Sequence, residues 1–140
     1  MTLQGFFFYE WFERITETME DEECSVYEAE TQLGEGMVTH DRISEMVMQK
    51  AEMFEDLIEA VGLHHEHGDA PTRLVALIHV ANGISSEIGF GDNDGSAIKY
   101  SRPALKALGL KRDAVREMVE DLRDPVTKEI MDVINQCLGD

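Results

Sequence analysis

One apolar segment decides the fold class of this chain: TRLVALIHVANGISSEI, from Thr72 to Ile88. Its apolar side chains recur at three- and four-residue spacings and cover more than half the circumference of a helix. The residues of this stripe are Leu74, Val75, Leu77, Ile78, Ala81, Ile84, Ser85 and Ile88. Asp69-Ala70-Pro71 precedes it, and proline fits the first turn of a helix. The pattern predicts a central buried helix.

The same spacing recurs on both sides and predicts an all-α fold, a compact helical bundle of about 7–8 helices. Upstream, we expect helices from about Phe6 to Met19 and from the capping box at Ser25 to about Leu33. Thr39 is a suitable N-cap for a third helix. The apolar residues expected to be buried in the third and fourth helices are Ile43, Met46, Val47, Phe54, Leu57, Ile58 and Val61.

Three further helices are expected downstream of the central one. The segment from Gly89 to Arg102 is rich in glycine and aspartate, which predicts the longest loop of the chain. The helices that follow are expected at Pro103 to Leu108, at about Arg112 to Leu122, and after Asp124-Pro125.

Acidic residues far outnumber basic ones: the 140 residues include 12 Lys and Arg against 29 Asp and Glu, a formal net charge of -17. This charge repels the phosphate backbone of nucleic acids and anionic membrane surfaces. No stretch approaches the ~18 uninterrupted apolar residues of a membrane-spanning helix. We therefore expect a single domain over residues 1–140 that binds neither nucleic acid nor membrane.

The N-terminus and the cysteines indicate a cytoplasmic protein. No basic residue precedes Arg14, so the charged start of a signal peptide is missing. Cys24 and Cys137 are too few for a disulfide framework, and neither belongs to a Cys-x-x-Cys pair. We expect two free thiols without a catalytic role.

Three histidines are candidate metal ligands: His40 at the start of the third helix, and the adjacent His64 and His65 after the fourth. Neutral imidazoles from several helices of a bundle can converge on one metal ion. A histidine in a helical protein is, however, more often a partly buried, hydrogen-bonded residue than a ligand. Spacing alone leaves both interpretations open.

Aromatic residues are concentrated near the N-terminus, where Phe6, Phe7, Phe8, Trp11 and Phe12 fall within one expected helix. A contiguous apolar patch of this size is unusual on a monomer and is typical of an interaction surface. A protein partner or a second copy of the chain would cover it. The alternative is that the first helix folds back on its own core.

Four short stretches, in order, resemble the second half of an HDOD domain: Glu28-Ala29-Glu30, residues 38–43 around His40, residues 59–66 around His64 and His65, and residues 76–82 ending at Asn82. The resemblance covers about residues 5 to 122. HDOD domains are a non-catalytic branch of the HD phosphohydrolase and HD-GYP superfamily. The resemblance implies an HD-domain-like helical fold and a role in bacterial signal transduction.

The chain departs from the active hydrolases of that superfamily at several ligand positions. The hydrolases carry a metal-ligating His-Asp pair at a position where this chain has Thr2-Leu3-Gln4-Gly5, so the pair is absent there. The late aspartate ligand falls on Asn82, whose neutral amide is a poor replacement for an anionic oxygen. The family's N-terminal helical half is also missing, which would leave apolar faces uncovered.

The sequence therefore predicts a non-catalytic HDOD-like signalling or regulatory module that acts through protein-protein contacts and needs no cofactor. The alternative is a degenerate HD-type metal-dependent phosphohydrolase or phosphodiesterase, in which His40, His64 and His65 hold one divalent metal. A further hypothesis treats the acidic region from Glu17 to Glu30 as a docking face for a basic partner.

Overall fold

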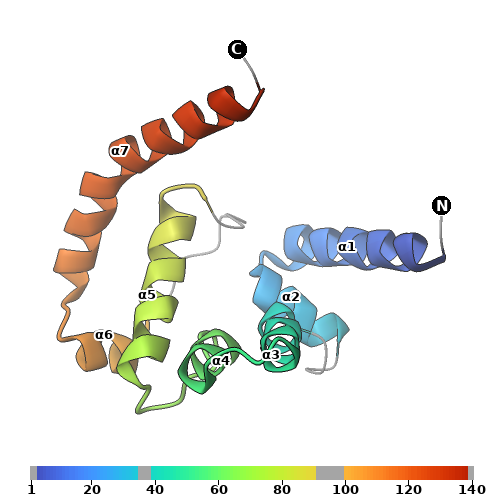
Figure 1. Cartoon of the computed structure of the whole chain (residues 1–140), viewed down its shortest axis with the longest axis horizontal. Helices are drawn as coiled ribbons and strands as arrows, with labels where there is room; N and C mark the ends of the chain where they lie inside the picture. The colour runs from blue at the N-terminus through green and yellow to red at the C-terminus, as the bar shows by residue number, and fades with distance from the viewer. Residues whose placement is uncertain (1–2, 35–38, 91–99, 139–140) are drawn as a thin grey trace.

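The structure, a computed structural model, describes residues 3–34, 39–90 and 100–138 of the chain, with side chains for 9–34, 39–90 and 100–137 (Figure 1). This part of the chain contains seven helices and no strand, which confirms the all-α prediction. The helices are α1 (Leu3–Glu22), α2 (Val26–Leu33), α3 (His40–Lys50), α4 (Glu55–Gly62), α5 (Arg73–Glu87), α6 (Arg102–Leu108) and α7 (Arg112–Leu138).

Helices near one another in the sequence pack against one another: α1 against α2, α3 against α4, α4 against α5, and α5 against α6 and α7. In Figure 1, α1 and α7 lie at opposite sides of the molecule, and α3 and α4 lie between them at its base. The central part of this face is therefore bordered by helices from both ends of the chain.

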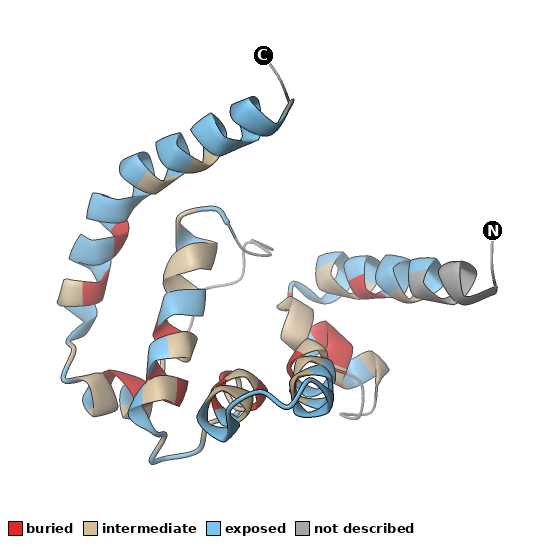
Figure 2. Ribbon diagram, in the orientation of Figure 1, coloured by how far each residue is buried: buried red, intermediate tan, exposed pale blue. Residues whose placement is uncertain are grey.

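Two small hydrophobic cores are separated along the chain, and Figure 2 shows their buried residues in two groups of helices. The first joins α1 to α2 and consists of Ile15, Cys24 and Ala29, with Trp11, Met19, Val26 and Leu33 packed against them. The second joins α5, α6 and α7 and consists of Ala76, Val80, Ala104, Leu105 and Val115. The buried side chains are mostly small, so the helices of each core lie close together and each core is small.

The helix ends follow the capping chemistry expected from the sequence. Ser25 and Glu28 form a complete capping box at the start of α2. The hydroxyl groups of Thr72 and Ser101 accept backbone N–H bonds at the starts of α5 and α6. Gly109 ends α6 with a φ of 69°, a left-handed conformation that glycine adopts without steric cost.

The prediction of two separate C-terminal helices is wrong, because α7 runs continuously through Pro125. Proline removes one backbone hydrogen bond and clashes with the preceding turn, so it more often bends or breaks a helix. Figure 1 shows α7 changing direction along its length. The C-terminal part of the helix is largely exposed (Figure 2).

The predicted buried face of α3 is also wrong. Met46 and Val47 are 68% and 60% exposed, and Ile43 is exposed as well. The side that packs toward α4 carries Asp41 and Glu45 instead, and the Glu45 carboxylate fills the space beside Gly62. The polar contacts of its first turn thus orient α3 with its apolar stripe toward solvent.

The ends and faces of α4 and α5 show smaller differences from the expected pattern. Phe54 is the N-cap of α4 and is 79% exposed rather than buried. In α5, Val75 is buried as expected, but Leu77 and Ala81 of the predicted stripe are exposed, and Ala76 and Val80, which lie outside that stripe, are buried instead. The loop predicted between α5 and α6 includes residues 91–99, which lie outside the described residues.

Two further expectations from the sequence concern the cysteines and membrane-spanning helices. Cys24 is buried, Cys137 is exposed, and neither forms a disulfide among the described residues. Among the described helices, none combines the length and apolar character needed to cross a membrane.

The burial pattern predicts the outcome of two substitutions. Val115 is buried between α5, α6 and α7, so Val115→Ala should lower the free energy of unfolding by about 2 kcal/mol. Asn82 is exposed on α5, so Asn82→Leu should change it by less than about 0.5 kcal/mol. Chemical denaturation of both variants measures the difference. A larger loss for Asn82→Leu than for Val115→Ala would contradict the described packing.

Candidate functional site

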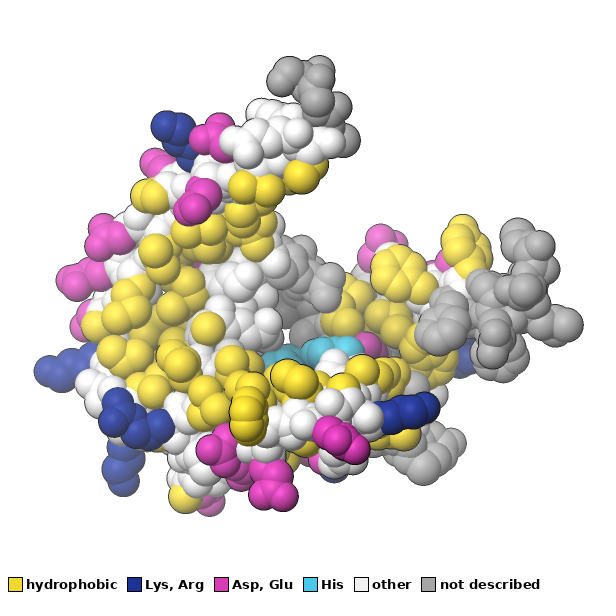
Figure 3. Space-filling view, viewed as in Figure 1, with side chains coloured by type: hydrophobic (Ala, Val, Ile, Leu, Met, Phe, Trp, Pro, Cys, Tyr) yellow, Lys and Arg dark blue, Asp and Glu magenta, His cyan; other side chains and the backbone are white. Residues whose placement is uncertain are grey.

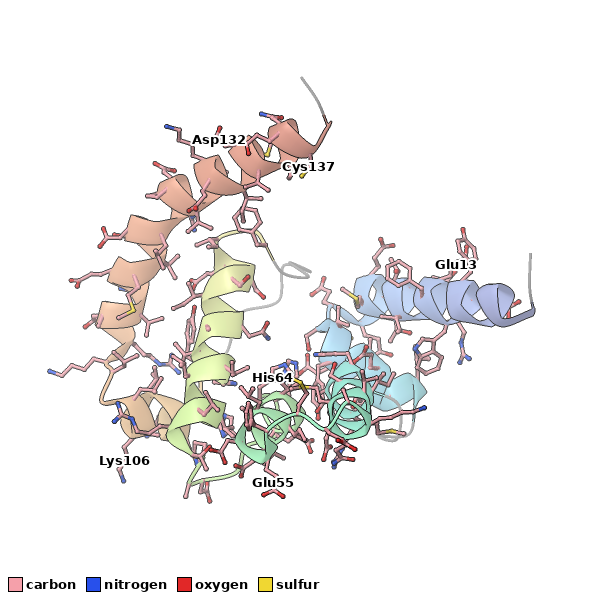
Figure 4. All side chains as sticks on the ribbon, viewed as in Figure 1. Glu13, Glu55, His64, Lys106, Asp132 and Cys137 are labelled. Atoms are coloured by element: carbon pink, nitrogen blue, oxygen red, sulfur yellow. The ribbon has the colours of Figure 1, made fainter. Side chains whose placement is uncertain are left out.

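The three predicted histidines lie together between the two cores. His40 is the first residue of α3, and His64 and His65 follow the end of α4. One ligand nitrogen from each lies within 4.8 Å of the other two. Figure 3 shows the histidines in the hollow between α1 and the rest of the molecule, and Figure 4 places His64 above α4, beside the start of α5.

The position of His40 depends on Glu30 of α2. Thr39 makes no side-chain cap for α3, although its backbone is extended like that of an N-cap residue. Glu30 Oε2 takes over this role and accepts the His40 backbone N–H at 2.9 Å. The same oxygen accepts the His40 Nδ1–H at 2.7 Å. One carboxylate therefore caps α3 from outside and fixes the orientation of the imidazole.

His64 and His65 are held by backbone groups on both sides of their turn. His64 Nδ1–H donates to the Val61 carbonyl oxygen at 2.6 Å. His79 of α5 donates from Nδ1 to the His64 carbonyl oxygen at 2.7 Å, and its Nε2 accepts the Ser101 N–H at 3.2 Å. The turn is thereby tied to the middle of α5 and, through Ser101, to the start of α6.

Tyr27 of α2 and the imidazoles pack as one aromatic group. The Tyr27 ring stacks on His65 with centroids 4.3 Å apart and planes at 13°. The rings of His64 and His65 are 4.0 Å apart, and His40 meets His65 edge to face at 4.9 Å. Stacking of this kind positions the rings without using their nitrogen lone pairs.

The nitrogen geometry fits a metal ion. Because His40 and His64 donate through Nδ1, their Nε2 atoms carry lone pairs when the rings are neutral. His65 Nε2 lies 3.0 Å from His40 Nε2. Two nitrogens bonded to zinc at ~2.1 Å in a tetrahedron are about 3.4 Å apart. In the metal-free protein His65 Nε2–H donates to the His40 lone pair, so one ion can bind both nitrogens once the His65 proton is on Nδ1 and the two rings separate slightly.

His64 and His65 favour the neutral form that binds metals. Burial, together with the neighbouring rings of His64 and His40, lowers the pKa of His65 from 6.5 to about 3. Burial is also the main cause that lowers the pKa of His64. A metal ion at this site would compete with few protons at neutral pH.

A pocket of about 380 Å³ adjoins the histidine cluster. Its wall is mostly apolar and includes Phe12, Ile15 and Met19 of α1, and it reaches Glu30 and His40. The pocket therefore connects the exposed face of α1 with the hydrogen bond between Glu30 and His40.

The aromatic surface predicted near the N-terminus divides into two parts among the residues with described side chains. Trp11 packs against the core of α1 and α2, as the alternative interpretation expected. Phe12 is 68% exposed, as the interaction hypothesis expected. Phe6, Phe7 and Phe8 belong to α1, but their side chains lie outside the described residues.

Sequence reasoning missed the residues that support the histidines. The sequence pattern assigns no role to Glu30, Asp41 or Tyr27, although each acts directly on the cluster. Nothing in composition distinguishes Glu30 from the other acidic residues of this chain. Its place on the buried face of α2, next to Ala29, was the available signal.

Comparisons with protein-family models, curated proteins and solved structures returned no match. The functional argument therefore depends on the residues and their geometry.

The buried neutral histidines predict acid sensitivity. In the unfolded chain His65 takes up a proton near pH 6.5, whereas in the folded chain it stays neutral down to about pH 3. Between these values the unfolded state binds more protons, so the free energy of unfolding falls as the pH falls. The melting temperature of the metal-free protein should therefore decrease as the pH is lowered from about 6.5.

The variant His65→Gln removes one of the titrating groups. We expect a smaller change of melting temperature per pH unit in this variant than in the wild-type protein between about pH 6.5 and 5. The slope is the relevant quantity, because the substitution also removes the stack on Tyr27 and can lower the melting temperature at every pH. Equal slopes would show that His65 is not held neutral by the fold.

Proposed function

We propose that this chain is a non-catalytic, HDOD-like regulatory module that acts through protein-protein contacts in bacterial signal transduction. The observation that carries the proposal is the set of large apolar side chains that the described helices expose. The most exposed of them are Tyr9, Phe12, Met46, Val47, Phe54 and Val133. They occur on α1, α3, the start of α4 and α7.

On α3 the exposed apolar side chains form a stripe. Ile43, Met46 and Val47 occupy one side of α3, and all three are exposed. Contiguous exposed apolar surface of this kind marks an interaction site, because burying each large side chain contributes roughly 1.5–3 kcal/mol. Figure 3 shows hydrophobic side chains along the sides of both α1 and α7 that border the hollow.

The charge of the chain limits the kind of partner. Acidic residues also occur on α1, where Glu13 lies one turn after the exposed Tyr9, and the whole chain has a formal net charge of -17. A partner with an apolar contact surface and basic residues around it would be attracted, whereas a second copy of this acidic chain would be repelled at low salt. We therefore favour a different protein over self-association.

Site-specific photocrosslinking tests this proposal. A photoreactive phenylalanine analogue placed at Phe12 of the full chain, expressed in its native host, should give a discrete adduct with one protein. The same analogue at Gln32, an exposed polar position of α2, is the matched control and should give none. Adducts of equal pattern at both positions, or no adduct at Phe12, would contradict the assignment of α1 as a contact helix.

A second candidate function is binding of a divalent metal, which the convergence of His40, His64 and His65 favours. Three neutral imidazoles form a known zinc-binding set, and Glu30 supplies the outer carboxylate that commonly orients a ligating histidine. The metal, when bound, would supply a Lewis acid at the base of the hollow.

The degenerate-enzyme form of this hypothesis requires more than metal binding. Phosphoester hydrolysis by the related HD enzymes uses carboxylate ligands to hold metals that activate water. Here the late aspartate is replaced by Asn82, which is exposed to solvent, and Thr2-Leu3-Gln4-Gly5 stands where the resemblance places the His-Asp pair of the hydrolases. We therefore propose metal binding without hydrolysis.

Zinc should stabilise the protein through the histidine cluster. At a free zinc concentration about 100 times the dissociation constant, the gain is about 2.7 kcal/mol and raises the melting temperature. His40→Ala and His64→Ala should abolish this shift. His67→Ala should retain it, because His67 bonds Ser101 and lies outside the cluster.

Hydrolysis of a chromogenic phosphodiester with added manganese provides the second readout for these variants. We expect wild-type protein and His64→Ala to be equally inactive. Activity that disappears in His64→Ala would contradict the non-catalytic proposal and establish a residual enzyme.

A further inference from the structure

Basic residues of this acidic chain gather on α6 and at the start of α7. Residues 102–112 contain Arg102, Lys106, Lys111 and Arg112 and no Asp or Glu, although acidic residues outnumber basic ones by 29 to 12 in the whole chain. All four side chains are exposed. Figure 3 shows Lys and Arg side chains at the corner of the molecule that α6 occupies, and Figure 4 places Lys106 on the outer side of α6. The charge of this surface is therefore opposite to that of the chain.

These cations surround an open pocket with an apolar floor. The pocket has a volume of about 660 Å³ and is lined by Arg102, Leu105, Lys106, Leu110 and Arg112. Leu105 belongs to the core of α5, α6 and α7, and Leu110 packs against that core, so the fold fixes the floor. The Arg112 guanidinium donates to the Tyr100 carbonyl oxygen at 3.3 Å, which ties it to the backbone just before α6.

The cations of α6 have no carboxylate partner among the described residues. Arg102 and Lys106 form no ion pair with another described residue, whereas Arg42 and Arg116 each pair with a carboxylate three residues away. Arg102 and Lys106 are four residues apart on α6, so their side chains are neighbours, and like charges at this spacing repel each other. An anionic group bound between them would remove this repulsion.

We infer that this pocket is a docking site for a short acidic segment of a partner protein, with an apolar side chain between its carboxylates. Charge complementarity carries the inference, because the site is basic and unneutralised. The carboxylates would pair with Arg102, Lys106 and Arg112, and guanidinium groups can bind a carboxylate through two parallel hydrogen bonds. The apolar side chain would pack on Leu105 and Leu110.

The exposure of the cations favours a peptide segment over other anions. An ion pair in contact with water contributes little, so a single small anion would be held weakly. A segment with several carboxylates makes several pairs at once. A nucleic acid also offers many charges, but its long phosphate backbone would meet the acidic remainder of the chain, which repels it. A short acidic segment contacts the basic pocket alone.

This site goes beyond the contact surface proposed on α1. In Figure 1, α1 and α6 lie on opposite sides of the molecule. The surface on α1 is suited to a partner with basic residues, whereas the pocket on α6 takes acidic ones. A module with both surfaces would join two proteins of opposite charge. Photocrosslinking at Phe12 does not depend on the pocket, so either surface can fail its test without the other.

Fluorescence anisotropy of a labelled peptide tests the pocket in the full chain. The probe is a short peptide of glutamates with two central leucines. Lys106→Glu should weaken its binding by about tenfold, because the reversal replaces an attraction with a repulsion of similar size. Lys128→Glu makes the same change of charge at an exposed position of α7 outside the pocket. This control should alter binding by less than about twofold, since salt screens distant charges.

Two further probes separate the contributions to binding. A peptide with serines in place of the leucines should bind about tenfold more weakly, because it cannot bury apolar surface on the floor. The methyl resonances of Leu105 and Leu110 in the wild-type protein should shift when the leucine peptide binds. This NMR measurement tests the location of the site even if Lys106→Glu fails to fold.

The inference is overturned if the leucine peptide does not bind at low salt, or if it binds without shifting either leucine. Equal losses in Lys106→Glu and Lys128→Glu would also contradict it, because binding would then follow the overall charge. Equal binding of the serine peptide would exclude a role for the apolar floor. If a single-stranded oligonucleotide binds more tightly than the peptide and loses affinity in Lys106→Glu, the pocket takes nucleic acid and the assignment to an acidic protein segment is wrong.

Discussion

The hydrogen bonds from His40 to Glu30 are the interaction on which the rest of the structure depends. The chain has one thin core between α1 and α2 and another among α5, α6 and α7. Glu30 belongs to the helix that carries the first core, and His40 begins the helix that leads, through α4, to the second. Where most small domains use a shared apolar core, this chain connects its parts through a polar cluster reinforced by the stack of Tyr27 on His65.

Such a connection explains why α3 has an unexpected orientation. A buried carboxylate must keep its donors, because a buried charge that loses them is strongly destabilising. The first turn of α3 therefore turns His40 and Asp41 inward, and the apolar stripe of Ile43, Met46 and Val47 follows on the outside. The exposed surface that supports protein contact and the buried cluster that supports metal binding are thus two results of one constraint.

Local signals in the sequence were sufficient to predict where the helices lie, but insufficient to predict which face of each helix is buried. Periodicity and capping residues located most of the helices, since a capping box or an N-cap hydroxyl acts within four residues. Pro125 was interpreted as a helix start, but α7 continues through it. The faces of α3, and the distance between His40 and His65, depend on Glu30 and Tyr27 of another helix. No periodicity within one segment encodes such contacts.

The position of the cluster also determines how its ligands can affect the exposed helices. Some ligands bind only when α2 and α3 hold His40 in place. Such a ligand, whether a metal, a proton or a partner, stabilises that arrangement by its own binding free energy. The pocket beside Phe12 reaches Glu30 and His40, so a partner inserted there contacts the groups that orient the metal ligand. Under the proposed function, metal affinity and partner affinity are therefore linked reciprocally: whatever factor the metal applies to partner binding, the partner applies to metal binding.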